Sequence, residues 1–176
     1  MPFIIALVGI IITAYFWANR ARDAGNMARD IADMAGDVKL AARRFGFARR
    51  ADVHPVESIE DPDIAAAAIA DAFVSLDDLP SKDQQTHMMD QLRRVLNVDS
   101  ATAQELLVLG TWLVNECGGP LQAVTRITKK LYRMEGSSAL TPLEDILTGI
   151  KDADGSDLSL RQREALHEIK TILRSR

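Results

Sequence analysis

This chain of 176 residues has little of what most catalytic and metal-binding sites need. It contains one cysteine, Cys117, and three histidines that lie far apart along the sequence. A single cysteine cannot form an internal disulfide and is typical of a reducing compartment, and no two histidines have the spacing of zinc ligands. The sequence also lacks a glycine-rich phosphate loop, a G-x-S-x-G elbow and an H-E-x-x-H motif. We therefore expect a protein that is not an enzyme.

Long hydrophobic runs are scarce too, with one exception near the N-terminus. Residues 3–18 contain no charged side chain and end in Tyr15, Phe16 and Trp17, where the aromatic belt of a membrane-spanning helix belongs. Sixteen helical residues span about 24 Å, somewhat less than the hydrocarbon core of a bilayer. Arg20 and Arg22 follow directly and can reach the lipid headgroups.

The sequence therefore predicts a single transmembrane anchor over residues 1–19. A cleaved signal peptide and a buried helix are the alternatives. The signal peptide is disfavoured because no positive charge precedes the run in the sequence and no small-x-small cleavage site follows it.

Positive charge is concentrated next to this run. Residues 1–50 hold eight of the 21 Lys and Arg residues but four of the 25 Asp and Glu residues, so their net charge is +4, against −8 for residues 51–176. By the positive-inside rule, the C-terminal part lies in the cytoplasm, attached to the inner (cytoplasmic) membrane. An acidic C-terminal part disfavours nucleic-acid binding, which needs a basic face.

A basic stalk is predicted over residues 20–47, where alanine, methionine and isoleucine recur every three or four positions. It can be a helical extension of the anchor, a seam for self-association or for a partner helix, or an amphipathic membrane-bound helix. A run of basic and aromatic residues, 43–50, joins the stalk to the next segment and is predicted to meet either anionic lipid headgroups or a partner, of which lipid headgroups are the simpler interpretation. Its basic members are Arg43, Arg44, Arg49 and Arg50. Residues 48–60 are predicted to be a linker.

The remaining residues, 61–176, have helical periodicity throughout and no alternating strand pattern. Ser81 and Ser159 are each followed by glutamine three positions later, which is typical of a capping box, and Thr141 is followed in the same way by glutamate. The sequence predicts an all-α compact bundle of about six helices. Their predicted bounds are 62–77, 82–97, 100–117, 121–135, 142–155 and 159 onward.

The predicted helix over residues 100–117 is the strongest candidate for the core of the bundle. Its apolar residues form a stripe of four helical turns. The stripe consists of Ala103, Leu106, Leu107, Gly110, Leu113, Val114 and Cys117. Because Gly110 has no side chain, we predict that a neighbouring helix crosses close to it.

Two acidic turns between helices are candidates for weak binding of calcium or another divalent cation. Their candidate ligands are Asp77, Asp78, Asp83, Asp152 and Asp154. The second turn does not match an EF-hand, because a loop starting at Asp152 has Asp157 in place of the glycine and Arg163 in place of the glutamate. Solvated turns without a metal are the simpler interpretation of both.

The turn residues Asp61-Pro62, Asp154-Gly155 and Leu158-Ser159, with the alanine-rich helix after Pro62, resemble those of the TerB-like (tellurite-resistance) helical domain. The layout also resembles membrane-anchored DnaJ-like co-chaperones, which place one transmembrane helix before such a domain. However, the His-Pro-Asp tripeptide of a J domain is replaced by His54-Pro55-Val56, so no co-chaperone activity is implied. The resemblance implies an envelope-stress scaffold, and in that family the first acidic turn has been linked with metal binding.

Together these patterns predict a non-catalytic, membrane-tethered cytoplasmic interaction module. It would serve either as a stress-related scaffold or as an accessory subunit of a larger membrane complex, with a protein partner and no cofactor. The rival hypothesis is a divalent-metal sensor or a metal-dependent activity based on the acidic turns.

Overall fold

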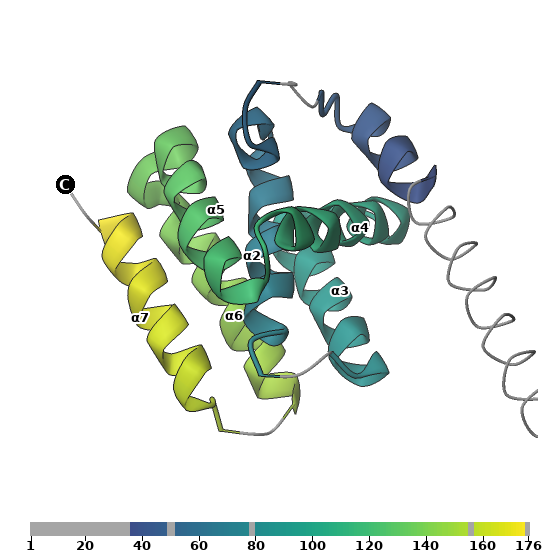
Figure 1. The fold of residues 1–176 in the computed structure, drawn as a ribbon. Coiled ribbons are helices and arrows are strands. Elements are labelled where there is room, and N and C mark those ends of the chain that lie inside the picture. The colour runs from purple at the N-terminus through teal and green to yellow at the C-terminus, as the bar shows by residue number, and fades with distance from the viewer. Residues whose placement is uncertain (1–35, 49–51, 78–79, 155–156, 175–176) are drawn as a thin grey trace, which may run out of the picture. The chain divides into compact units, whose positions relative to one another are not determined.

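The computed structural model describes residues 36–48, 52–77, 80–154 and 157–174, and for residues 152–154 it describes the backbone alone. The chain divides into two compact units, Met1–Asp37 and Val38–Arg176. From Pro55 onward, the described part of the second unit contains six α-helices, two short 3-10 helices and no strands (Figure 1). This confirms the predicted all-α class and the number of helices in the bundle.

The helices follow one another through short turns, after a helical stretch over residues 36–44. In chain order they are η1 (Pro55–Ser58), α2 (Pro62–Val74), α3 (Lys82–Leu96), α4 (Ser100–Glu116), α5 (Pro120–Glu135), η2 (Gly136–Ala139), α6 (Leu140–Asp154) and α7 (Leu160–Arg174).

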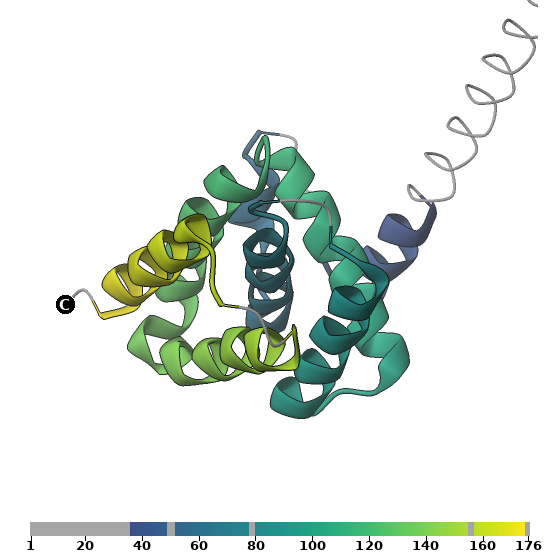
Figure 2. The same ribbon diagram turned by 90° about the horizontal axis from the view of Figure 1, so that it is seen from below.

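Helix α2 is the centre of the bundle. It contacts each of α3 to α7, and the two views in Figures 1 and 2 show it between the other helices. Every residue from Ile64 to Val74 is buried. A helix that is apolar on all sides belongs in the interior of a domain, and its run of alanines favours the helical state while keeping the helix thin. The core is therefore built around α2, and α4 is one of the helices that cover it.

Helices α2 and α4 cross closely at Gly110. A Cβ atom added at Gly110 of α4 would lie 3.1 Å from the Cα and N atoms of Ala68 and 3.2 Å from the carbonyl carbon of Ala67. These are backbone atoms of a fully buried helix, so they have no room to move. The predicted close crossing at Gly110 is confirmed, and small residues on both helices make it possible.

Local capping residues set most of the helix ends. Both predicted serine–glutamine capping boxes are present, at Ser81 with Gln84 and at Ser159 with Gln162. At the start of α2 the side chain of Asp61 accepts a hydrogen bond from the Asp63 backbone N–H at 2.9 Å. These hydrogen bonds depend on neighbouring residues alone, which is why the sequence predicts the two capping boxes.

The start of α6 differs from the prediction that Thr141 would be an N-cap. The helix begins at Leu140, two residues before its predicted first residue Pro142, because the 3-10 helix η2 runs directly into it without a break. Pro142 is then the third helical residue, where its missing N–H is harmless because the first-turn N–H groups have no partner within the helix.

The bundle also includes residues that precede the predicted boundary near residue 60. In the segment predicted to be a linker, Val56 and Ile59 are fully buried. The His54 ring accepts a hydrogen bond from the Val56 N–H at Nδ1, and its Nε2 lies 3.1 Å from the carbonyl oxygen of Glu116 at the end of α4. The compact unit therefore extends toward the N-terminus as far as Val38.

The last part of the predicted stalk packs against α4. Ala41 is fully buried, and the rings of Phe47 and Trp112 meet edge to face with their centroids 5.7 Å apart. The guanidinium group of Arg44 forms an ion pair with Glu105 at 3.1 Å and donates a hydrogen bond to the Thr102 hydroxyl at 2.8 Å.

Replacing Gly110 with alanine should destabilise the domain, although alanine is the better helix former. The added methyl group would press on the backbone of α2, and overpacking of this kind costs about 1–3 kcal/mol of unfolding free energy. The measurement is thermal and urea unfolding of the full-length chain in detergent, followed by circular dichroism.

Gly149→Ala on α6 is the matched control. The three atoms nearest to its added methyl group all belong to the side chain of Gln91, which can turn away, so this variant should be at least as stable as the wild type. A Gly110→Ala variant as stable as the Gly149→Ala variant would contradict the close crossing.

Candidate functional site

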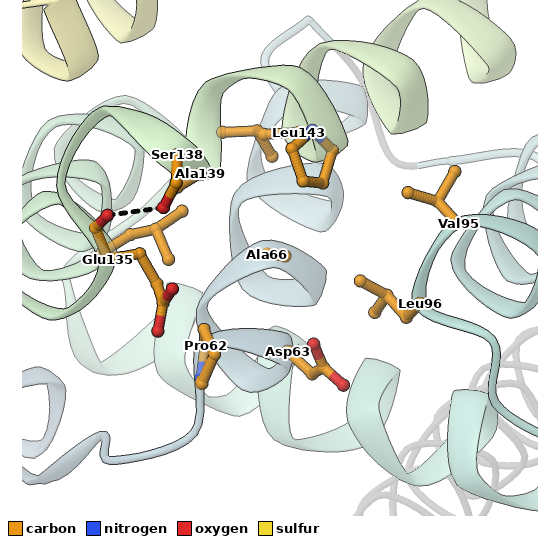
Figure 3. A pocket seen from close by; sticks show the side chains of 11 residues that line it. Pro62, Asp63, Ala66, Val95, Leu96, Glu135, Ser138, Ala139 and Leu143 are labelled. Carbon is orange, nitrogen blue, oxygen red and sulfur yellow. Dashed lines mark hydrogen bonds between the residues drawn. The ribbon is translucent and has the colours of Figure 1, made fainter.

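The described part of the chain contains a pocket of about 280 Å³ at one end of α2. Its walls come from the start of α2, the end of α3, the end of α5, η2 and the start of α6. In Figure 3, Ala66 of α2 lies in the middle, with Val95 and Leu96 of α3 on one side and Leu143 of α6 on another. Four separate helix ends thus build it.

The lining of this pocket is mainly apolar. Alanine, valine, leucine and proline side chains supply most of it, and Leu143 is itself part of the hydrophobic core. Ser138 is the single hydroxyl among the lining residues, and its Oγ donates a hydrogen bond to the Glu135 carbonyl oxygen at 2.6 Å. The pocket is therefore suited to an apolar group, and its one hydroxyl group is already engaged.

Two carboxylates, Asp63 and Glu135, are the charged groups among the residues that line the pocket. Asp63 lies in the first turn of α2, where the N-cap Asp61 and Pro62 fix the backbone. Glu135 is the last residue of α5, which ends where Gly136 takes a positive φ of 64°. Figure 3 shows the two carboxylates on either side of Pro62. Helix ends, and not a shared helix face, bring them to the same pocket.

The pKa of Asp63 is raised above its ordinary value. Partial burial raises this pKa most, and the nearby negative charges of Asp61 and Glu135 raise it further. Within the described part of the chain, neither Asp63 nor Glu135 forms an ion pair. A positively charged group at this position would therefore be stabilised by carboxylates that have no cation of their own.

The predicted membrane contacts Tyr15, Phe16, Trp17, Arg20, Arg22, Arg49 and Arg50 lie outside the described residues. Arg43 is exposed, and Arg44 is paired with Glu105. Among the helices that the structure describes, none is long and apolar enough to cross a membrane. The predicted anchor over residues 1–19 belongs to the part that is not described, so it stays a prediction.

The predicted metal ligands are only partly within the described residues. Asp77 and Asp83 are exposed on either side of the turn between α2 and α3, whereas Asp78 and the side chains of Asp152 and Asp154 are not described. In the described ranges, no three histidine, cysteine, aspartate or glutamate side chains gather closely enough to hold a metal ion. Divalent-cation binding therefore stays a prediction.

The pocket carboxylates were not predicted from the sequence. Asp63 and Glu135 stand at the start of one helix and the end of another, and no spacing rule connects two helix ends. An acidic residue in the first turn of α2 is a recognisable local feature, because it complements the positive end of the helix dipole. Its proximity to Glu135 arises only from the tertiary packing of the helices.

A second perturbed carboxyl group lies inside the bundle. Asp71 is in the last turn of α2 and is 7% exposed. Burial raises its pKa to about 6, because the charged form loses its hydration, and a hydrogen bond with the Thr111 side chain of α4 offsets part of this rise. It joins the two helices that cross at Gly110, so we interpret it as a structural polar group.

This carboxyl group makes stability depend on pH. Between its ordinary pKa of 3.8 and the raised value of about 6, Asp71 keeps its proton in the folded state and loses it in the unfolded state. The folded state therefore loses about 3 kcal/mol of stability as the pH rises through this range. Asp71→Asn should remove this dependence and be more stable than the wild type at pH 7, as measured by urea unfolding at several pH values.

The difference between the two unfolding profiles isolates Asp71 from the other carboxyl groups. If the difference in unfolding free energy between the wild type and Asp71→Asn stays constant between pH 4 and pH 6, then Asp71 has the same pKa in the folded and the unfolded state. Asp145→Asn, which neutralises an exposed aspartate on α6, is the control and should leave the profile unchanged.

Comparisons with known proteins found no match among protein-family models, among curated proteins or among solved structures. The resemblance to TerB-like domains therefore stays a prediction from the turn residues.

Proposed function

We propose that this chain is a non-catalytic interaction module, tethered to the cytoplasmic face of the inner membrane, that docks a protein partner on its helical bundle. The observation that carries this proposal is the apolar pocket of about 280 Å³, whose lining includes two carboxylates that form no ion pair within the described part of the chain. An accessory subunit of a membrane complex and a stress-related scaffold are the two forms of this function.

The composition of the pocket supports binding over chemistry. Its lining residues contain no histidine, cysteine, lysine or arginine, and its one hydroxyl group, on Ser138, donates its hydrogen bond to the Glu135 carbonyl oxygen and not to a side-chain base. The volume lies at the lower limit of small-molecule sites, which occupy roughly 300–1,000 Å³. One large side chain of a partner is a better match to this size than a cofactor.

Support for the tether comes from the sequence. The uncharged run over residues 3–18, its aromatic end and the eight basic residues up to Arg50 have the order expected of a single-pass anchor followed by a cytoplasmic domain. A protein held at the membrane meets its partners at a high local concentration, so a small pocket is sufficient for function.

Divalent-cation sensing is the second candidate function. The exposed side chains of Asp77 and Asp83, which flank the turn between α2 and α3, favour it. A rise in melting temperature on addition of calcium, abolished by alanine at both positions, would support it over the docking function.

Cross-linking of the full-length protein in mild detergent, followed by identification of what co-purifies, tests the docking function. We expect stoichiometric enrichment of a defined membrane protein or complex, with cross-links to the helical bundle. Recovery of the chain alone, at cross-linker levels that capture known complexes from the same membrane, would contradict it.

Topology can be tested separately with reporters fused after Arg176. A reporter that functions only in the cytoplasm should give a signal, and one that functions only in the periplasm should give none, because the basic residues follow the predicted anchor. The reverse pattern would overturn the orientation. Recovery of as much protein in the soluble fraction as in the membrane fraction would overturn the anchor.

A further inference from the structure

We propose that the pocket at the end of α2 receives a basic amphipathic helix of a partner protein, which inserts one large apolar side chain and pairs a lysine or arginine with Asp63 and Glu135. This inference rests on the proposed docking function and adds the chemistry of the partner to it.

The apolar half of the partner follows from the shape and lining of the pocket. Val95, Leu96 and Leu143 form apolar walls around Ala66, whose small side chain leaves space that a larger residue would fill (Figure 3). A single leucine, phenylalanine or methionine side chain entering this space would remove apolar surface from water on both partners, which contributes about 1.5–3 kcal/mol per side chain.

The basic half follows from charge complementarity. Asp63 and Glu135 have no cation beside them in the described part of the chain, and the nearby Asp61 adds a third negative charge. A partner with a glutamate or aspartate here would meet like charges in a partly buried site, which is strongly unfavourable. Over the whole compact unit, residues 38–176, there are 18 Lys and Arg residues against 21 Asp and Glu residues, so its net charge of −3 also favours a basic partner.

An organic cation fits this site better than a metal ion does. Calcium needs six to eight oxygen ligands, whereas the side chains that line the pocket offer two carboxylates and one hydroxyl group among apolar side chains. A lysine or arginine side chain combines an apolar stem with a charged end, so it matches both parts of the lining.

Helical spacing explains how one partner can supply both groups. Residues three or four apart on a helix lie on the same face, about 5–6 Å apart at their Cβ atoms. With an apolar residue and a basic residue at this spacing, the apolar side chain would enter the pocket while the basic one reaches the two carboxylates, which is the recognition mode of an amphipathic helix in a groove.

The test uses full-length protein in nanodiscs of zwitterionic lipid, so that basic peptides have no anionic lipid to bind. The probe is a fluorescently labelled helical peptide of leucine and lysine, compared with a leucine and glutamate peptide of the same length and pattern. Fluorescence anisotropy should show saturable binding of the lysine peptide and none of the glutamate peptide. Equal binding of both peptides, or no binding of either, would overturn the inference.

Charge variants locate the binding site. Asp63→Asn combined with Glu135→Gln should weaken binding of the lysine peptide by about tenfold or more, which corresponds to about 1.4 kcal/mol. Asp157→Asn combined with Glu164→Gln removes the same charge from exposed positions that do not line the pocket, and it should leave the affinity unchanged. An equal loss in both double variants would show attraction by overall charge and would overturn the pocket site.

A space-filling variant keeps the test independent of charge. Ala66→Leu places extra carbon atoms in the open pocket, so the fold should be retained while the partner side chain is excluded. Unchanged peptide binding by a folded Ala66→Leu variant, with its circular dichroism spectrum intact, would contradict insertion into the pocket.

The same variants separate this inference from the proposed function. If the full-length wild type captures a membrane partner and the pocket variants capture it equally well, docking stands and the pocket inference fails. If the wild type captures none, the proposed function itself fails, whatever the peptides do.

Discussion

The burial of α2 on all sides is the constraint on which the rest of the domain depends. Eleven consecutive residues, Ile64 to Val74, are buried, so five other helices must cover them. Alanines keep the central helix thin, and Gly110 lets α4 approach its backbone to near the limit of contact. One consequence is that a polar residue on α2 cannot reach water freely, and Asp71 meets its need by a hydrogen bond with Thr111 and by a raised pKa.

The pocket follows from the same arrangement. Around the middle of α2 the covering helices pack closely, whereas at its N-terminal end α3 and α5 both end and α6 begins. Side chains at helix ends are less crowded by neighbours, so a space remains above Ala66 (Figure 3). Residues at helix ends also tend to be polar, and here they are Asp63 and Glu135. An apolar hollow with negative charge beside it is thus a natural by-product of covering one buried helix.

Individual elements show how far the sequence could be interpreted. The two serine–glutamine capping boxes and the ends of α5 at Pro120 and Gly136 were predictable, since they depend on hydrogen bonds and backbone angles within a few residues. The central position of α2 was not, because a helix with many alanines has the same periodicity whether one side or all sides are covered. For the same reason, the apolar stripe of α4 makes this helix the strongest core candidate in the sequence. The structure departs from the predicted stripe at two positions: Leu109, which is not part of the stripe, is buried, and Leu107, which is part of it, is only half-buried.

By itself, the sequence determined the all-α class, the number of helices in the bundle and nearly all their ends, because helix formation and capping are local. It also supplies the arrangement of an uncharged run, basic residues and an acidic domain that suggests a tether. Only the tertiary structure decided that residues from Val38 onward join the bundle, that α2 is its centre and that Asp63 and Glu135 share a pocket. These features depend on which faces of distant segments meet, and that choice is made by packing the whole core at once.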